Sequence, residues 1–295
     1  MTSNSEMPTA PFNDSTADTI LRSVDGVDFL VHSSLLSLAS PVFRTMFSLP
    51  QAASEPRDGL KTVQLTEQAT EIDDMLRFWY PGAHPHIRSI DHLADIIQLA
   101  IGKYDMETLV PMAKVFLAQY LSSDALTVFA VAFRFGWEES VQSAARECLK
   151  LPLRSASQSL SKAWIHTSGT AYHALIEYHL RCGDAIRALP QEATSGWILR
   201  WPPHFPASCC SLTWTGELCG RAAWLSTFFI QYCDKLSYAP RAGVDASWVM
   251  DNLVAPQSGF CHKCRSYPYR AAMDLIDNVW SPLATSKIAE IQLIL

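Results

Sequence analysis

The chain has 295 residues, of which 48% are hydrophobic and 18% are charged, and it carries a formal net charge of −6. One folded core rarely grows beyond roughly 250–300 residues, so this length favours two structured units. The acidic balance and the scattered Lys and Arg side chains exclude a strongly basic surface. They therefore argue against nucleic acid or an anionic membrane as a partner.

The first 16 residues, MTSNSEMPTAPFNDST, have neither a basic start nor an apolar stretch, so they do not resemble a secretory signal. Their Ser, Thr, Pro and Asn content predicts a disordered tail over residues 1–16. The longest apolar runs, near residues 125–133 and 222–230, are shorter than the roughly 20 residues of a membrane-spanning helix. We therefore expect a soluble intracellular protein, in the cytoplasm or the nucleus.

The segment from Asp18 to Phe47 has the clearest pattern of the chain. Apolar residues alternate over residues 20–24 and again over 27–31, which predicts two short strands. Asp25-Gly26 between them fits a two-residue type I′ turn, because glycine readily adopts the positive φ that this turn needs. A helix should follow, capped by Ser33 or Ser34.

A second helix is expected to begin at Ser40-Pro41. Serine caps the free amides of a helix start, and proline at the first helical position gives up only an amide that has no partner there.

This order of hairpin, short helix and Ser-capped second helix resembles the opening of a BTB/POZ domain, a protein-interaction module. The domain departs from the usual pattern at Ser33, where most such domains have Lys or Arg. The resemblance implies an α+β fold with a small sheet packed by helices. It is carried by one spaced set of residues: Asp25, Gly26, Phe29, His32, Leu35, Leu36, Ser40, Phe43, Met46 and Phe47.

The rest of the first third predicts one more strand and three more helices. Residues 62–65 can add a strand to the hairpin, and helical spacing follows over residues 70–79, 91–101 and 105–120, with Asp91 as the cap of the middle helix. Two pieces, LRFWYPG and GKYDM, resemble the later helices of fungal BTB proteins. The predicted BTB/POZ-like domain therefore covers residues 17–121.

The remainder predicts a mainly α-helical C-terminal region. Two short helical patterns separated by Gly136, and a longer one ending before Pro190, predict a helical extension over residues 122–189. Such an extension often follows a BTB domain. Residues 190–295 combine a segment dense in Cys, Trp and Pro with further helices, where Pro282 should kink or split the last one.

One spacing suggests a metal. Cys261 and Cys264 could hold a structural zinc ion from a single turn, together with Cys210 and Cys219 from the irregular segment. Fungal BTB proteins often carry a similar Cys-x-x-Cys-Arg near their end. Other candidate ligands are Cys209, His204, Cys233 and His262, and the alternative is a set of reduced, buried cysteines.

No catalytic residue and no cofactor site are predicted. The chain lacks G-x-S-x-G, a phosphate-binding G-x-x-x-x-G-K-[ST], G-x-G-x-x-G and H-E-x-x-H. His32 lies between a strand and a helix and fits a structural role. Glu177, Tyr178 and His179 with Cys182 look like a metal half-site, because positions three apart share a helix face. We expect His179 to be a solvated residue rather than a ligand.

The most consistent interpretation is a non-enzymatic scaffold or adaptor that binds other proteins and that could self-associate. Many BTB proteins recruit a cullin-type ubiquitin ligase through a hydrophobic-x-Glu element after the second helix. The corresponding stretch, residues 47–51, has no such element. A second alternative is a ligand-binding or catalytic C-terminal domain that uses residues 197–264 as its pocket.

Overall fold

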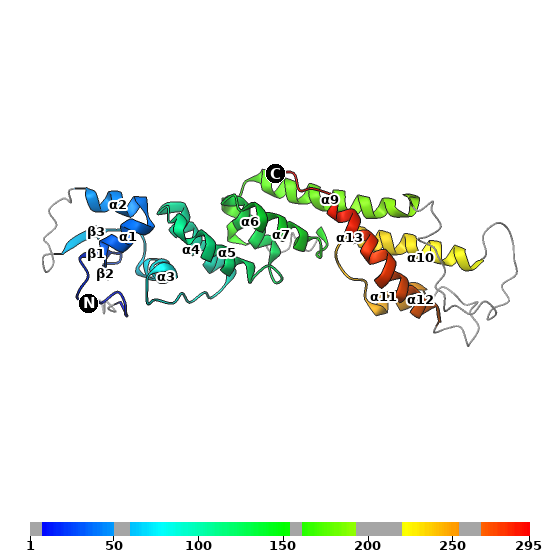
Figure 1. Cartoon of the computed structure of the whole chain (residues 1–295), viewed down its shortest axis with the longest axis horizontal. Coiled ribbons are helices and arrows are strands. Elements are labelled where there is room, and N and C mark those ends of the chain that lie inside the picture. The colour runs from blue at the N-terminus through cyan, green and yellow to red at the C-terminus, as the bar shows by residue number, and fades with distance from the viewer. Residues whose placement is uncertain (1–7, 50–59, 154–160, 193–219, 254–266) are drawn as a thin grey trace. The chain divides into compact units, whose positions relative to one another are not determined.

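The computed structural model describes residues 8–49, 60–153, 161–192, 220–253 and 267–295 (Figure 1). The chain divides into two compact units, residues 1–127 and residues 128–295. The first contains a small sheet with helices, and the second is helical in the part that is described. The expected combination of an α+β N-terminal domain and a mainly α-helical C-terminal region is thereby confirmed.

Three strands form the sheet of the first unit: β1 (Thr19–Arg22), β2 (Asp28–Val31) and β3 (Lys61–Gln64). Their order is β2-β1-β3, with β1 antiparallel to β2 and parallel to β3. Ile20 and Leu21 are both buried, so the central strand is covered on both faces. The predicted hairpin and the predicted third strand are confirmed.

The hairpin turn differs from the expected type I′ turn. Arg22 pairs with Asp28, and Ser23 N donates to Val27 O, so the connection between the paired residues is longer than two residues. Gly26 has φ of 86°, and its N–H donates to Ser23 O at 3.1 Å. A type I′ turn needs positive φ at both central residues, and Asp25 does not adopt it. Glycine was therefore correctly identified as the left-handed position, but in a three-residue loop.

The helices of the first unit begin with α1 (Ser33–Ala39) and α2 (Pro41–Ser48), which lie beside the sheet in Figure 1. Ser40 caps α2 as predicted, since its Oγ accepts the Phe43 N–H at 3.0 Å. The start of α1 uses no cap from its own serines. Instead, Asp18 Oδ1 accepts the Ser33 N–H at 2.7 Å.

The later helices of this unit are α3 (Ala69–Trp79), α4 (Ile90–Ile97) and α5 (Val110–Ala118). A π-helical turn, η2 (Gln98–Lys103), continues α4, and a 3-10 turn, η3 (Glu107–Leu109), precedes α5. Ser89, not Asp91, caps α4, because the serine oxygen reaches the His92 N–H. Aromatic and aliphatic side chains form the core of the unit, among them Phe29, Leu36, Phe43, Ile72, Met75, Phe78, Leu93 and Tyr104.

The packed part of the first unit starts before residue 17, within the segment 1–16 that was predicted to be a disordered tail. Phe12 is fully buried, and its carbonyl oxygen accepts the Leu30 N–H from the edge strand β2. The Arg77 guanidinium carbon lies 5.2 Å from the centre of the Phe12 ring. The buried ring, the hydrogen bond from β2 and the contacts of Arg77 therefore hold this polar segment against the first unit.

The second unit is built from α6 (Ala125–Arg134), which begins within the first unit, α7 (Glu138–Cys148) and a 3-10 turn, η4 (Lys162–His166). They are followed by α9 (Gly169–Glu192), α10 (Gly220–Ser237), α11 (Ala246–Leu253) and α12 (Tyr267–Leu275). A π-helical turn, η5 (Ile276–Trp280), leads into α13 (Ser281–Ala289), with Pro282 in its first turn. Pro282 thus begins a helix, whereas α9 continues past Pro190 to Glu192.

Helices α9 and α10 approach each other closely at Gly183. A Cβ atom at this position would lie 2.4 Å from the backbone oxygen of Ser237, so only glycine fits there. No helix in the described ranges is long and apolar enough to cross a membrane.

Candidate functional site

The residues of the spaced pattern join separate elements of the first unit. The Asp25 carboxylate accepts the Ala69 N–H at 2.9 Å and so connects the hairpin to the start of α3. Phe29 is buried in the core, while Leu35 and Phe47 are half-buried. Each of these side chains is in a position where packing or capping explains its type.

His32 is held by a tyrosine from the end of α3. Its backbone N–H donates to Tyr80 Oη at 3.0 Å, and its Nδ1 lies 2.7 Å from the same oxygen. Nε2 of the ring is 3.3 Å from Thr16 Oγ1. These contacts to two hydroxyl groups give His32 a positioning role at the junction of β2 and α1.

Ser40 and Phe43 connect α2 to Tyr104, which follows the π-helical turn. The Ser40 hydroxyl donates to the backbone oxygen of Tyr104. The Phe43 and Tyr104 rings are stacked, with centroids 4.5 Å apart and an interplanar angle of 6°. Both rings are buried, so this pair forms the centre of the packing between α2 and the turn after α4.

A buried carboxylate, Glu67, completes this junction. It accepts hydrogen bonds from Lys103 Nζ and from Tyr104 Oη, the latter at 2.7 Å. Burial raises the pKa of Glu67, but the hydrogen bonds from Lys103 and Tyr104 outweigh it and keep the pKa below its ordinary value. Burial, followed by the Glu67 carboxylate, raises the pKa of the Tyr104 hydroxyl. Lys103 and Tyr104 of the KYDM sequence are therefore hydrogen-bond donors to the buried Glu67 carboxylate.

We expect this carboxylate to stabilise the fold in a pH-dependent way. Because the pKa of Glu67 is lowered by folding, its contribution is fully present above the ordinary pKa of a glutamate and is lost as the pH falls through the folded value. A Glu67→Gln variant should lose about 1–3 kcal/mol of unfolding free energy at pH 7. The difference from the wild type should shrink towards about pH 3.

Urea unfolding at several pH values between 7 and 3 measures this difference. Glu107→Gln is the matched control, because Glu107 is an exposed carboxylate of the same unit. If the difference in unfolding free energy between the wild type and Glu67→Gln is the same at every pH, the Glu67 carboxylate has no such role.

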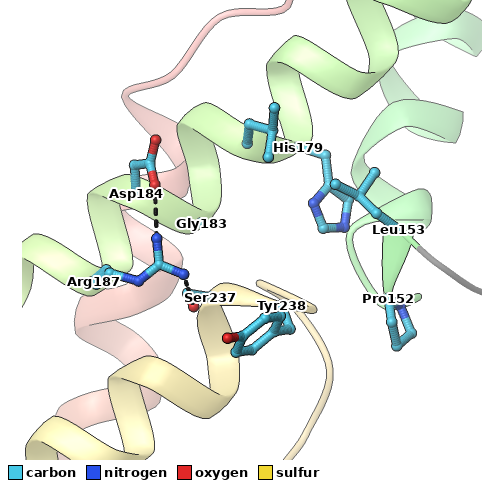
Figure 2. Close-up of a pocket in the computed structure, with 9 residues that line it drawn as sticks. Pro152, Leu153, His179, Gly183, Asp184, Arg187, Ser237 and Tyr238 are labelled. Carbon is cyan, nitrogen blue, oxygen red and sulfur yellow. Dashed lines mark hydrogen bonds and ion pairs between the residues drawn. The ribbon is translucent and has the colours of Figure 1, made fainter.

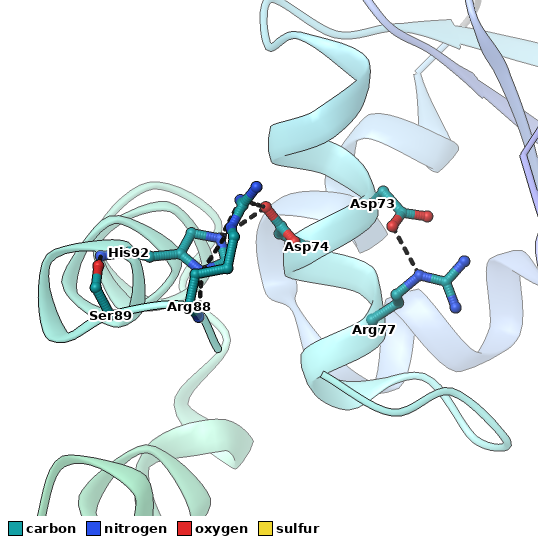
Figure 3. Close-up of polar contacts among 6 residues, drawn as sticks. All are labelled: Asp73, Asp74, Arg77, Arg88, Ser89 and His92. Carbon is teal, nitrogen blue, oxygen red and sulfur yellow. Dashed lines mark hydrogen bonds and ion pairs between the residues drawn. The ribbon is translucent and has the colours of Figure 1, made fainter. Parts of the chain in front are cut away.

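A polar bridge joins α3 to the start of α4 (Figure 3). Asp74 Oδ2 lies 2.7 Å from Arg88 Nη2 and 2.7 Å from His92 Nε2. His92 Nδ1 accepts the backbone N–H of Arg88 at 3.2 Å, and His92 Nε2 also lies 2.7 Å from Arg88 Nη2. Asp73 and Arg77 form a separate pair along α3, at 2.7 Å.

Beside this bridge is a cavity of about 450 Å³, here called the α3–α4 cleft. It is lined by Thr70, Glu71 and Asp74 from α3, by Arg88, His92, Asp95 and Ile96 at α4, and by Gln98, Leu99 and Lys103 from η2. This volume falls in the range of roughly 300–1,000 Å³ that is typical of ligand sites. The cleft thus combines charged side chains with two apolar ones, Ile96 and Leu99.

A second hollow, of about 470 Å³, lies in the second unit between α9, the end of α10 and the residues after α7 (Figure 2). Arg187 crosses it and donates to Asp184 and to Ser237 Oγ, at 3.0 and 2.8 Å. His179 is 3% exposed, its Nε2 lies 3.0 Å from Leu151 O, and burial lowers its pKa. The expectation of a solvated His179 is therefore wrong, because this face of α9 is covered.

The proposed zinc ligands Cys210, Cys219, Cys261 and Cys264 lie outside the described residues, as do Cys209, His204 and His262. Within the described ranges, no group of three or more His, Cys, Asp or Glu side chains could hold a metal ion. Cys233 is buried, which raises the pKa of its thiol to about 12. The zinc site remains a prediction, and two parts of the proposed C-terminal pocket over residues 197–264, namely residues 197–219 and 254–264, are likewise not described.

Apolar side chains are exposed on α1 and α2. Leu38 of α1 is 72% exposed and Leu49, at the end of α2, is 55% exposed. Val42 and Met46 are half-buried and share a face of α2 with Leu49 because of their spacing. Pro50 and Gln51, the end of the stretch compared with the cullin-binding element, lie outside the described residues.

Two comparisons with known proteins both find a similarity to POZ-domain proteins. Residues 10–121 match the family model of the BTB/POZ domain. A curated protein from Mus musculus, "TD and POZ domain-containing protein 3", is 25% identical over 159 residues. That match covers 52% of this chain but only 42% of the mouse protein.

Sequence reasoning missed Glu67 and the α3–α4 cleft. Glu67 lies in the loop between β3 and α3, where no helical or strand periodicity of apolar residues indicates that a side chain is buried. The GKYDM match was a usable signal, since the hydroxyl of a tyrosine in a core position requires a hydrogen-bond partner.

Proposed function

Because residues 10–121 of this chain are a BTB/POZ domain, we propose that the protein is a non-enzymatic scaffold or adaptor that acts by binding other proteins. BTB/POZ domains are generally protein–protein interaction modules, and the match to this family is the observation that carries the proposal. The helical second unit would then supply a further surface or position a partner.

The exposed leucines of α1 and α2 are the first surface to test. Large apolar side chains that remain exposed in a group often mark an interaction site. Leu38 belongs to α1 and Leu49 directly follows α2, the two helices contact each other, and both side chains are more than half exposed. An apolar surface of this kind is suited to a second apolar surface, including the same surface on another copy of the chain.

Self-association through this surface gives a defined expectation. Light scattering of the full chain should show a mass that rises with concentration from 32.8 kDa towards twice that value. A Leu38→Asp/Leu49→Asp variant should weaken the association roughly tenfold or more, because a charge would have to be buried in the interface.

Val115→Asp is the matched control, since Val115 of α5 is 64% exposed but lies outside this surface. A constant mass of one chain at all concentrations would rule out self-association. Affinity purification of the full chain with and without the two Leu substitutions then tests for other partners. Recovery of a cullin that depends on these leucines would support the narrower role of a ligase adaptor.

A further inference from the structure

We propose that the α3–α4 cleft binds a Lys or Arg side chain presented by a partner protein. This inference rests on the proposed function, because it specifies the chemistry of one partner of the interaction module. It depends on the charges, the unpaired acceptor and the apolar walls of the cleft.

The charges of the cleft leave an excess of carboxylates. Arg88 is paired with Asp74, and Lys103 is paired with Glu67, which does not line the cleft. Glu71 and Asp95 are exposed carboxylates that have no cationic partner among the described residues. Since both cations of the cleft are already engaged, an added cation is attracted and an added anion is repelled.

The cleft also holds an acceptor without a donor. Gln98 contributes to its wall, and its Oε1 is a buried oxygen with no hydrogen-bond partner in the described structure. Such an atom is uncommon, because an unsatisfied buried acceptor costs about 1–3 kcal/mol. Lys ammonium and Arg guanidinium groups carry only donors, so they suit a cleft whose lining holds both an unpaired acceptor and carboxylates without a cationic partner.

The backbone around Gln98 supports a binding role. Gln98 starts the π-helical turn η2, and such turns occur frequently at functional sites. Four residues on, a Cβ at Gly102 would lie 2.7 Å from Gln98 Nε2 and 2.8 Å from its Oε1. The glycine therefore provides the space in which the amide lies against the backbone.

The walls of the cleft distinguish an amphipathic side chain from a bare ion. Ile96 and Leu99 line the cleft beside the charged groups. Lys and Arg bury their methylene stems along apolar surface while their charged ends stay with polar partners. A metal ion gains nothing from these walls, and no set of three acidic, His or Cys side chains in the described ranges could hold one.

Ligand-observed NMR on the full chain tests the proposal with defined probes. N-acetyl-arginine N-methylamide and N-acetyl-lysine N-methylamide should show saturation transfer and saturable titration. The neutral N-acetyl-glutamine N-methylamide should bind at least about fivefold more weakly, because it lacks the charge. Equal binding of the neutral probe would overturn the proposal, and so would no binding of either cationic probe.

Two sets of substitutions assign binding to the cleft. Glu71→Gln combined with Asp95→Asn should weaken the cationic probes at least about fivefold, while Glu107→Gln, outside the cleft, should not. Gln at position 71 can still cap α3 through the Gln68 N–H, so the double variant keeps its fold. Equal weakening by the control variant would contradict the assignment.

Gln98→Met separates binding from stability. Met has a similar volume and removes the unpaired oxygen, so probe affinity should fall while the melting temperature stays the same or rises. Unchanged affinity would show that Gln98 is not part of the site. These tests need no partner protein, so the probes can bind even if the protein does not self-associate. Failure of cation binding in the cleft can therefore be distinguished from failure of the proposed function.

Discussion

A Phe43→Ala variant is expected to lose about 3–5 kcal/mol of unfolding free energy, which is the usual loss for a buried phenylalanine. Phe43 is fully buried in α2, and its ring is stacked on Tyr104 and lies 5.9 Å from the Phe47 ring. Alanine would leave a cavity between α2 and the turn after α4. Tyr104 would lose the face against which it packs, and with it part of the support for the Glu67 carboxylate.

Urea unfolding measures the loss, and hydrogen exchange of peptides from α2 and η2 shows where it occurs. Val42→Ala is the matched control, because Val42 precedes Phe43 in the same helix but is only half-buried. If Phe43→Ala costs no more than this control, Phe43 is not a core residue. If the variant is stable but loses binding to partners, the ring acts in recognition instead.

Trp280→Ala should have a similar effect on the second unit, with a loss of about 3–5 kcal/mol. Trp280 is fully buried, and the centre of its ring lies 5.9, 4.7 and 5.3 Å from the ring centres of Phe228, Phe229 and Tyr232. This aromatic group connects α10 to the end of the π-helical turn before α13. Removal of the indole would therefore separate two helices that are far apart in sequence.

Near-ultraviolet circular dichroism and thermal unfolding detect this change, because packed aromatic rings give the near-ultraviolet signal. Met250→Ala is the control, since Met250 of α11 is 43% exposed and should cost less than about 0.5 kcal/mol. A Trp280→Ala protein that keeps both its near-ultraviolet signal and its melting temperature would contradict the packing of α10 against the last helices.

The α3–α4 cleft is of interest for specificity. BTB/POZ domains share a fold, so residues that differ from the core pattern are the ones that can select partners. Glu71, Asp95 and Gln98 lie around one cavity, and neither exposed carboxylate has a cationic partner among the described residues. If a basic side chain binds in the cleft, its affinity should fall as the salt concentration rises. This dependence on salt distinguishes the cleft from the apolar surface of α1 and α2.

Local patterns were sufficient for most elements of the first unit. Alternation identified β1 and β2, helical spacing identified α3 and α4, and Ser40-Pro41 gave the start of α2. These features depend on interactions within a few residues, so they can be read without knowledge of the fold. The hairpin turn was misjudged because Asp-Gly fits more than one loop length, and the strand pairing decides between them.

Local patterns therefore predicted the BTB/POZ-like order of elements, the buried Phe43 of α2 and helices in the described part of the second unit. Only the tertiary structure decided that Phe12 is buried, that Glu67 is paired with Lys103 and Tyr104, and that Asp74, Asp95 and Gln98 surround one cleft. The physical reason is that burial and charge pairing join residues tens of positions apart. Nothing in their local sequence records which distant side chain will be in contact.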